Sequence, residues 1–576
     1  MQPTEPRPFA RRQPYFFYGI LLICLSYLIA EYFFIPYGAL SADEFVFARH
    51  IYEYTFHVPY RDFAPYKTVL GYYLLSLPFF FSHTLFGPLF YAKGEIALLN
   101  VGFIALTAYW SSRFFNQKAI LLTLLAIIAN QLFLVYATDL RVDMLTSWVS
   151  LAAALGVLQY RSWLGGCLVG MAFLISQKAL WYVAALNGAL ALCALLPYSR
   201  YSFRFLIQFN VAAALPILLY ISGYSAIASP RLVLYNLFYE AYIQAGIDWY
   251  MPIFWRCWQA ILYHGPLLFL LWPLTFLILF KKPIKKPIEQ SIFILTFSSI
   301  ALLLFITYKQ PFPYNAVFTV PAFFLLYADF ISWLLTLPKY SAGKSLFFTL
   351  FITLGILYPF YTSWQTCRLL DGHYQQTMLK TVTHLLQPGE DYVAGIPFLY
   401  QQDQPIDGMK NLIGPAIDYL YSPTDKLRPL LLPSLYLSPT SPPKILAEFD
   451  KMSVKIIINN YRLLYLPPAI VNYIKNNYQH LYGSIYLYAP TIAPSQLTFY
   501  LKFTGSYRLQ AKISVIIDGK RKQPGQIISL KKGDHTTHAD ENYRLVLIPD
   551  RDRSLPVFDS QYQQDKYFYM LKAIVV

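Results

Sequence analysis

The chain has 576 residues, of which 56% are hydrophobic and 18% aromatic, and its mean hydropathy is +0.40. No soluble domain of this size is so apolar, so the composition indicates a polytopic membrane protein. The formal net charge is +16. In a membrane protein basic residues follow the positive-inside rule, so this charge does not indicate binding to nucleic acid. The five cysteines form neither a disulfide framework nor a metal-ligand spacing.

The apolar segments fill the first two thirds of the chain. A segment from about Phe16 to Pro36 follows three arginines and is predicted to be an anchor helix, since no cleavage site for a signal peptidase follows it. Further spanning helices are predicted near 95–112, 119–137, 144–160, 164–177, 179–197, 205–224, 259–280, 290–308, 314–337 and 345–364.

The segment from Tyr66 to Gly87 is long enough to span, but Pro78, Ser82 and His83 interrupt it. If it does not cross, all later clusters of Lys and Arg fall on the side of the N-terminal arginines, as the positive-inside rule requires. We therefore predict about eleven spans, a cytoplasmic N-terminus and an external C-terminus. These clusters are Arg113/Lys118, Arg161, Arg200/Arg204, Lys281/Lys282/Lys285/Lys286 and Lys339/Lys344.

The first external loop, predicted over 37–94, opens with an acidic pair, Asp43 and Glu44. Ser41 and Glu44 have the spacing of a helix capping box, in which each side chain bonds the other residue's amide. Asp43 then falls in the first helical turn, where the helix dipole favours an anion. The alternative is that Asp43 is a base at the boundary of water and lipid. The spacing leaves both interpretations open.

Three features of this loop together resemble a known family. The acidic pair, the segment Pro59–Phe63 (PYRDF) and Lys67 before an apolar helix resemble the first external loop of GT-C superfamily glycosyltransferases. The likeness is greatest to bacterial relatives of protein O-mannosyltransferases and of the lipid A aminoarabinose transferase, which take a sugar from a polyprenyl-phosphate carrier. It covers roughly residues 15 to 365. The prolines that usually follow the Lys are replaced by Thr68 and Val69.

The resemblance implies catalytic roles for Asp43, Glu44 and Asp143. Asp43 would take the proton from the acceptor hydroxyl, since an ordinary Asp is ionised at neutral pH. An inverting single displacement needs no carboxylate nucleophile. Asp139 and Asp143 are four residues apart, so a helical turn would place them on one face. Asp143 would bind a divalent cation together with Asp43 or hold a loop cation; the alternative is a capped helix start paired with Arg141.

Holding the donor phosphate requires cations and hydrogen-bond donors. Lys178 resembles a Lys that recurs between two spans of the family, and Lys309 with Tyr314 resembles the loop before a late span. For any single Lys the alternative is a residue that anchors a helix end at the interface. The predicted substrate-binding residues are Tyr66, Lys67, Asp139, Lys178, Arg231, Arg256, Lys309 and Tyr314. The metal ligands are unknown, and a divalent cation stays open as a cofactor.

Beyond the last apolar segment the composition changes to charged and turn residues. We predict three domains: a transmembrane domain over 1–365, an external α/β domain over 366–490 and an external β-sandwich-like domain over 491–576. In the α/β domain we predict strands at Tyr392–Pro397, Val454–Asn459 and Ser484–Tyr488 and a helix at Pro468–Gln479. In the β domain we predict strands at Gln496–Phe503, Leu509–Ile517, Ile527–Leu530 and Tyr543–Ile548, with turns at Asp518-Gly519 and Gly533-Asp534.

The sequence therefore predicts an integral membrane glycosyltransferase of the bacterial inner membrane. It would move a monosaccharide from a polyprenyl-phosphate carrier to a lipid, glycan or protein acceptor on the external side. One alternative is a transporter or flippase of a lipid-linked saccharide, which would be expected to place charges near mid-bilayer in paired halves. The other is a non-catalytic membrane scaffold.

Overall fold

The structure is a computed structural model that describes residues 14–63, 65, 68–82, 84–197, 199–239, 251–264, 272–273, 275–276, 288–308, 312–337, 342–369, 372–406, 409–410, 412 and 441–549. Its contacts divide the chain into two compact units. The first unit takes the described residues of 1–38 and 53–370, and the second takes those of 39–52 and 371–573. The first part of the predicted external loop thus belongs to the same unit as the C-terminal region.

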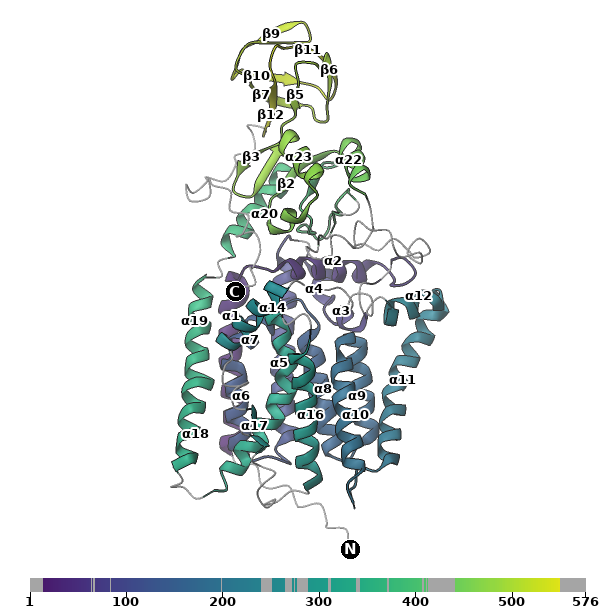
Figure 1. The fold of residues 1–576 in the computed structure, drawn as a ribbon, viewed down its shortest axis with the longest axis vertical. Helices are drawn as coiled ribbons and strands as arrows, with labels where there is room; N and C mark the ends of the chain where they lie inside the picture. The colour runs from purple at the N-terminus through teal and green to yellow at the C-terminus, as the bar shows by residue number, and fades with distance from the viewer. Residues whose placement is uncertain are drawn as a thin grey trace. The chain divides into compact units, whose positions relative to one another are not determined.

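The first unit is helical (Figure 1). Six of its described helical segments are long and apolar enough to cross a membrane: Pro14–Pro36, Gly87–Ser111, Phe203–Ile227, Ile288–Ile306, Pro313–Leu334 and Gly343–Ser363. The chain is therefore a multi-pass membrane protein. Its helices are α1 (Pro14–Tyr37), α3 (Leu70–Leu74), α4 (Leu77–Phe81), α5 (Gly87–Ser111), α6 (Gln117–Ala129), α7 (Gln131–Tyr136), α8 (Asp143–Leu158), α9 (Ser162–Ile175), η1 (Gln177–Ala179), α10 (Leu180–Ala194), α11 (Phe203–Ile227), α12 (Pro230–Leu234), η2 (Tyr235–Tyr239), α14 (Met251–His264), α16 (Ile288–Ile306), η4 (Pro313–Thr319), α17 (Val320–Leu334), α18 (Ala342–Ile352), η5 (Thr353–Leu357) and α19 (Tyr358–Leu369).

Helix α9 packs against both α8 and α11, and two glycines allow its close approach to α11 (Figure 1). A Cβ atom on Gly166 would lie 2.2 Å from the Phe209 carbonyl oxygen, and one on Gly170 would lie 2.3 Å from the Ala213 carbonyl oxygen. Neither distance leaves room for a side chain. Small residues four apart let membrane helices approach closely, and they set the position of the end of α9 that leads into η1.

The segment Tyr66–Gly87 is broken into short helices in its described part. Helices α3 and α4 have five residues each. A helix of that length extends about 7.5 Å, far less than the roughly 30 Å of a bilayer core. Neither helix is long enough to cross a membrane.

The predicted segment 119–137 is not one helix. It divides at Asn130 into α6 and α7. The Asn130 side chain accepts a hydrogen bond from the Leu132 amide at 2.9 Å, so Asn130 ends one helix and caps the next. The chain therefore changes direction at Asn130, shortly before residues 137–143, and does not continue through the bilayer as one straight helix.

The second unit begins with most of α2 (Ala42–Phe56), which continues into the first unit at Glu53. Its other elements are α20 (His373–Leu385), β1 (Asp391–Val393), α22 (Pro442–Lys451), β2 (Val454–Ile458), η8 (Tyr461–Tyr465), α23 (Pro468–Asn477), β3 (Tyr478–Tyr482), β4 (Ile485–Tyr488), β5 (Thr491–Ile492), β6 (Thr498–Leu501), β7 (Gly505–Gln510), β8 (Val515–Ile517), β9 (Lys520–Lys522), β10 (Ile527–Leu530), β11 (Gly533–His538) and β12 (Tyr543–Ile548). They form three four-stranded sheets in the orders β1-β2-β4-β3, β10-β7-β12-β5 and β6-β11-β8-β9.

The first of these sheets is mixed and the other two are antiparallel. Strands β1 and β2 run parallel, and β4 pairs antiparallel with both β2 and β3. Strands β10 and β12 have the predicted bounds, and Asp518 and Gly519 form the predicted turn with φ of 49° and 71°. Positive φ at both positions is what a two-residue hairpin turn requires. The C-terminal region thus has the predicted α/β and antiparallel β character.

Two predictions in this β region are wrong. The predicted strand Leu509–Ile517 is two strands, β7 and β8, which lie in different sheets. The connection 511–514 contains no Gly, Pro, Asn or Asp to mark it as a turn. Gly533 and Asp534 do not form a turn, because they begin β11 and pair with Leu501 and Tyr500 of β6.

Candidate functional site

A buried carboxylate lies between two cations where α8 begins. Oδ2 of Asp143 is 3.1 Å from Nε of Arg141 and 3.2 Å from Nζ of Lys178. The side chains of Asp143 and Arg141 are 4% and 6% exposed, and that of Lys178 is 20% exposed. Charges buried to this degree need partners, because their desolvation costs several kcal/mol each, of order 3–5 kcal/mol when a partner is removed. We call Arg141, Asp143 and Lys178 the central cluster.

The loop before α17 completes the surroundings of the central cluster. Oδ1 of Asn315 accepts a hydrogen bond from Nζ of Lys178 at 2.8 Å. The guanidinium of Arg141 lies 3.5 Å from the centre of the Tyr314 ring, and Lys178 lies 5.4 Å from the same ring. An aromatic face stabilises a cation without neutralising it. The Tyr314 ring therefore adds to the stabilisation that Asp143 gives to both cations.

Asp139 has a different partner from Asp143. Its Oδ1 is 3.7 Å from Nζ of Lys93, and both side chains are almost completely buried. The prediction that Asp139 and Asp143 share one face of a helix is wrong, because α8 begins only at Asp143. Residues before it form a turn in which the Arg141 amide donates to the Asp139 carbonyl. An acid at the first position of a helix is favoured by the dipole, so the helix starts at the second Asp and not at the first.

Buried amide and hydroxyl groups form hydrogen bonds at the same turn before α8. Asn100 donates to the hydroxyl of Tyr27 at 2.8 Å and to the carbonyl of Ala137 at 3.1 Å, and it accepts from Nε1 of Trp148 at 2.9 Å. Thr138 donates to a carboxylate oxygen of Glu31 at 2.9 Å. Asn100, Tyr27 and Trp148 are all buried. Such satisfied networks are rigid, so the backbone that carries Asp139 and Arg141 is held in one conformation.

The charged and aromatic residues of the site come from four separate helical elements and from the turn before α8. Lys93 lies in the second turn of α5, Asp143 starts α8, Lys178 lies in η1 between α9 and α10, and Tyr314 lies in η4 before α17. Each of them is at a helix end or in a connection. The structure therefore brings four predicted residues together, namely Asp139, Asp143, Lys178 and Tyr314, at one end of the helical unit.

The PYRDF segment has a structural explanation. The Asp62 carboxylate accepts from the Val58 amide at 2.7 Å and pairs with the Arg61 guanidinium at 2.8 and 2.9 Å. Hydrogen bonds from Arg61 and from the Val58 amide lower the pKa of Asp62 to about 2. Tyr60 has a φ of 65°, and its hydroxyl is 2.7 Å from that of Tyr220 on α11. Asp62 therefore holds a tight turn that fixes Tyr60 against α11.

The acidic pair belongs to the second unit. The Ser41 amide donates to Oε2 of Glu44 at 2.7 Å, and the Glu44 amide donates to Oγ of Ser41 at 3.3 Å. The predicted capping box is therefore present, and Glu44 is fully buried in it. Asp43 is 34% exposed, and its Oδ1 is 3.5 Å from Nη2 of Arg462. Of the two acids, the structure exposes Asp43 and uses Glu44 as a helix cap.

The other predicted substrate-binding residues are outside the central cluster. Arg231 on α12 and Arg256 on α14 are both exposed, and neither makes an ion pair with any other described residue. Tyr66, Lys67 and Lys309 lie outside the described residues.

Sequence reasoning missed Lys93, Asn315 and Arg462 and gave Arg141 only the role of a partner for Asp143. Lys93 could have been found, because a basic residue inside an otherwise apolar span needs a partner. Asn315 directly follows a predicted residue and has no signal of its own. Arg462 lies in a separate predicted domain, and no local pattern connects it with Asp43.

Within the described ranges, no group of three or more His, Cys, Asp or Glu side chains is arranged to hold a metal ion. The carboxylate best placed for one, Asp143, already contacts two cations. We therefore assign no metal ligand and derive no step through a metal.

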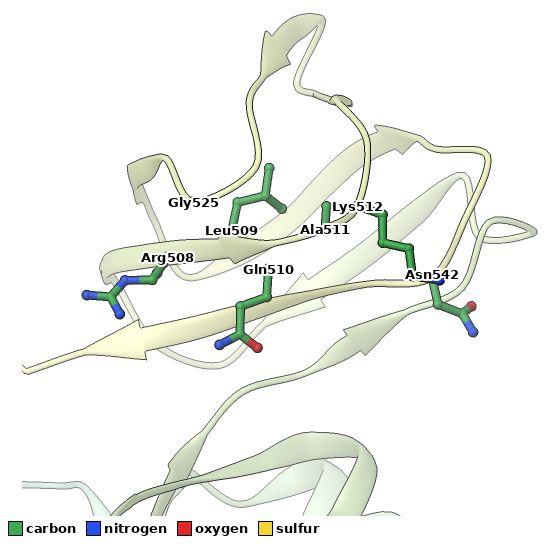
Figure 2. Close-up of a pocket in the computed structure, with 7 residues that line it drawn as sticks. All are labelled: Arg508, Leu509, Gln510, Ala511, Lys512, Gly525 and Asn542. Atoms are coloured by element: carbon green, nitrogen blue, oxygen red, sulfur yellow. The ribbon is translucent and has the colours of Figure 1, made fainter.

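A separate groove lies on the β region of the second unit (Figure 2). It has a volume of about 390 Å³ and is lined by Arg508, Leu509, Gln510, Ala511, Lys512, Gly525 and Asn542. Arg508 and Lys512 offer cationic donors, and Gln510 and Asn542 offer amides. None of these lining residues carries a carboxylate, imidazole or thiol. The groove therefore has groups for binding a polar ligand but no general base for chemistry on one.

The central cluster has the composition of an anion site. Two rigid cations are oriented by one buried carboxylate, and an amide and an aromatic ring fix their positions. Preorganised cations of this kind stabilise negative charge that develops on a bound group, because no reorganisation is needed when the charge appears. Lys178, the most exposed member, is the one best placed to contact a ligand directly.

Comparison with known proteins found no matching family model and no matching curated protein. Among solved structures, the chain is similar to ArnT from Cupriavidus metallidurans bound to undecaprenyl phosphate, with 15% identity and a TM-score of 0.49 over 68% of this chain and 84% of that one. The apo state of the same protein gives 13% identity and a TM-score of 0.47 over 66% and 84% of the two chains. The Archaeoglobus fulgidus oligosaccharyltransferase in complex with Zn and sulfate gives 12% identity and a TM-score of 0.44 over 89% and 75%.

Proposed function

We propose that this chain is a membrane glycosyltransferase of the GT-C kind. It transfers a monosaccharide from a polyprenyl-phosphate carrier to an acceptor hydroxyl by inverting single displacement. The observation that carries the proposal is the central cluster, in which Arg141 and Lys178 are held by the buried Asp143. A carrier of this type presents a phosphodiester at the membrane surface, and two rigid cations at the end of a helical unit suit that group.

The reaction balances with the groups proposed. The acceptor oxygen forms a bond to the anomeric carbon while the bond from that carbon to the phosphate oxygen breaks. The bonding electron pair leaves with the phosphate, which gains a second negative charge as a monoester. Lys178 and Arg141 stabilise that charge as it develops. The acceptor proton passes to the carboxylate of Asp43, the exposed member of the acidic pair.

The direction of the helices supports an external site. Helix α5 carries Lys93 near its start and ends at Ser111, so its far end is about 27 Å from Lys93. Arg113 and Lys118 follow that end, and Arg161 and Arg200 follow the far ends of α8 and α10. Basic loops mark the cytoplasmic side of a membrane protein. We therefore assign the central cluster to the external side of the inner membrane.

Reconstitution with a radiolabelled polyprenyl-phosphate sugar tests this function. The expected products are free polyprenyl phosphate and a labelled acceptor, with membrane lipids, glycans and peptides offered as acceptors in separate reactions. A transporter would move the intact donor between leaflets, and a scaffold would leave it where it is. Either result with a folded protein and a full panel of donors would overturn the proposal.

A further inference from the structure

Helix α2 is attached to the C-terminal part of the second unit at its first residues. The Leu40 amide donates to Oε1 of Gln375, and Nε2 of Gln375 donates to the Leu40 carbonyl, both at 2.9 Å. The Gln375 side chain thus pairs with the backbone of Leu40 as a neighbouring strand would, and Gln375 is buried. Two short hydrogen bonds from one amide define both the distance and the angle at which the chain enters α2.

Two further contacts fix the rotation of α2 about its axis. Nη1 of Arg49 donates to the Tyr400 carbonyl at 2.9 Å, and Arg49 is buried. The ring of Phe45 packs edge to face on Phe398 with 4.9 Å between ring centres. Because these contacts come from residues four apart on one helix, they define which face α2 presents. The direction of the Asp43 side chain is therefore set by residues of the C-terminal α/β region.

The cation that faces Asp43 is itself held by the same region. Arg462 lies in η8, its Nη1 donates to the Leu412 carbonyl, and its backbone amide donates to Oδ1 of Asn460 at 3.0 Å. Asn460 is fully buried and donates to the carbonyls of Ala394 and Ile458. The Arg462 side chain is only 12% exposed. It therefore keeps its position without relying on the carboxylate that it contacts.

We propose that Arg462 is the positioning residue of Asp43. This inference rests on the proposed function only in giving Asp43 the role of base. The guanidinium lies 3.5 Å from one carboxylate oxygen and favours one rotamer of the Asp43 side chain, which stays one third exposed.

Steady-state kinetics of the full-length protein test this role. We expect Arg462→Gln to lower kcat about ten- to a hundredfold while the donor KM changes less than about twofold. Arg462→Lys keeps the charge but cannot reach both Leu412 and Asp43 with one planar group, so we expect it to recover part of the loss. Arg521→Gln, which changes an exposed arginine of β9, is the matched control and should leave kcat unchanged.

A double-mutant cycle separates positioning from a structural role. In the Asp43→Asn background, Arg462→Gln should cause no further loss, because the residue it positions is already inactive. An equal loss in both backgrounds would overturn the proposal, as would full activity of Arg462→Gln. If Arg462→Gln does not fold, the cycle is run with Arg462→Lys, for which the same two outcomes apply.

Failure of the proposed function would be seen separately. Full activity of Asp43→Asn would remove Asp43 as the base, whatever Arg462→Gln does. An inactive Asp43→Asn together with a fully active Arg462→Gln would leave the base in place and remove only its positioning residue.

Discussion

Asp143 and Asp43 share one sequence signature, an acid in the first turn of a helix, yet their surroundings differ. Asp143 is 4% exposed with two cations at 3.1 and 3.2 Å, whereas Asp43 is 34% exposed with one cation at 3.5 Å. A buried carboxylate between two cations can organise them but cannot readily accept a proton from a substrate. An exposed carboxylate can do so. Burial, and not the motif, therefore separates the roles that we propose for the two acids.

The largest expected effect comes from Asp43→Asn. Asn keeps the size and most hydrogen bonds of Asp but cannot accept the proton, so turnover should fall about 10²- to 10⁴-fold. Donor affinity and thermal stability should remain those of the parent, because Ser41 and Glu44 still cap the helix. Turnover, donor binding and unfolding are measured on the same detergent-solubilised protein. If the variant is as active as the parent, Asp43 is not the base and, like Asp143, only organises a neighbouring cation.

Asp143→Asn should act mainly on stability and on donor binding. Removing the carboxylate leaves Arg141 and Lys178 buried without their shared partner, which costs about 3–5 kcal/mol. Thermal unfolding in detergent measures this loss. Asp403→Asn is the matched control, because Asp403 is about half exposed beside Lys410 and should affect unfolding far less. Equal unfolding temperatures for Asp143→Asn and the parent would show that Asp143 does not organise the two cations.

Lys178→Gln should weaken donor binding and also lower turnover, because Lys178 is proposed to contact the phosphate and to stabilise the charge that develops on it. Loss of one charge-assisted hydrogen bond to the phosphate costs about 1.5–3 kcal/mol, or roughly ten- to a hundredfold in affinity. Lys178→Arg keeps the charge and should retain part of the affinity. Binding of a fluorescent polyprenyl phosphate provides the measurement. If Lys178→Gln binds the lipid as the parent does, Lys178 only anchors Asp143 and Asn315.

Glu44→Gln gives the smallest expected effect. Gln also serves at this position of a capping box, so unfolding should change by no more than about 0.5 kcal/mol and turnover by less than about twofold. An inactive but folded Glu44→Gln beside an active Asp43→Asn would show that the base is the second acid of the pair.

Local patterns in the sequence predicted the features that depend on local physics. The capping box of Ser41 and Glu44 was predictable because both partners lie within one helical turn. Alternating apolar residues made β10 and β12 predictable. The turn was predictable because the pair Asp518-Gly519 favours positive φ. The break between β7 and β8 was missed because its connection has no turn residue. The break at Asn130 was missed because apolar residues continue on both sides of it.

The candidate site was only partly predictable, for a physical reason. Asp139, Asp143, Lys178 and Tyr314 were found because charged and aromatic residues at the ends of spans are costly without a role. Their pairing was not predictable, because Lys93 and Asn315 reach them through tertiary packing. Arg462 and Gln375 approach the first loop from the far part of the chain, and no window of sequence contains both members of either pair.

The contact between Leu40 and Gln375 joins residues 335 positions apart, and this spacing has a consequence for synthesis. A ribosome that adds about 5–20 residues per second needs roughly 15 to 70 seconds to make the intervening chain. During that time Phe45 and the backbone of Leu40 lack the partners that bury them in the finished protein. Residues 39–52 must therefore remain unaggregated until the C-terminal region has been made. The side chain of Asp43 can take up its final position only after Arg462 has been made.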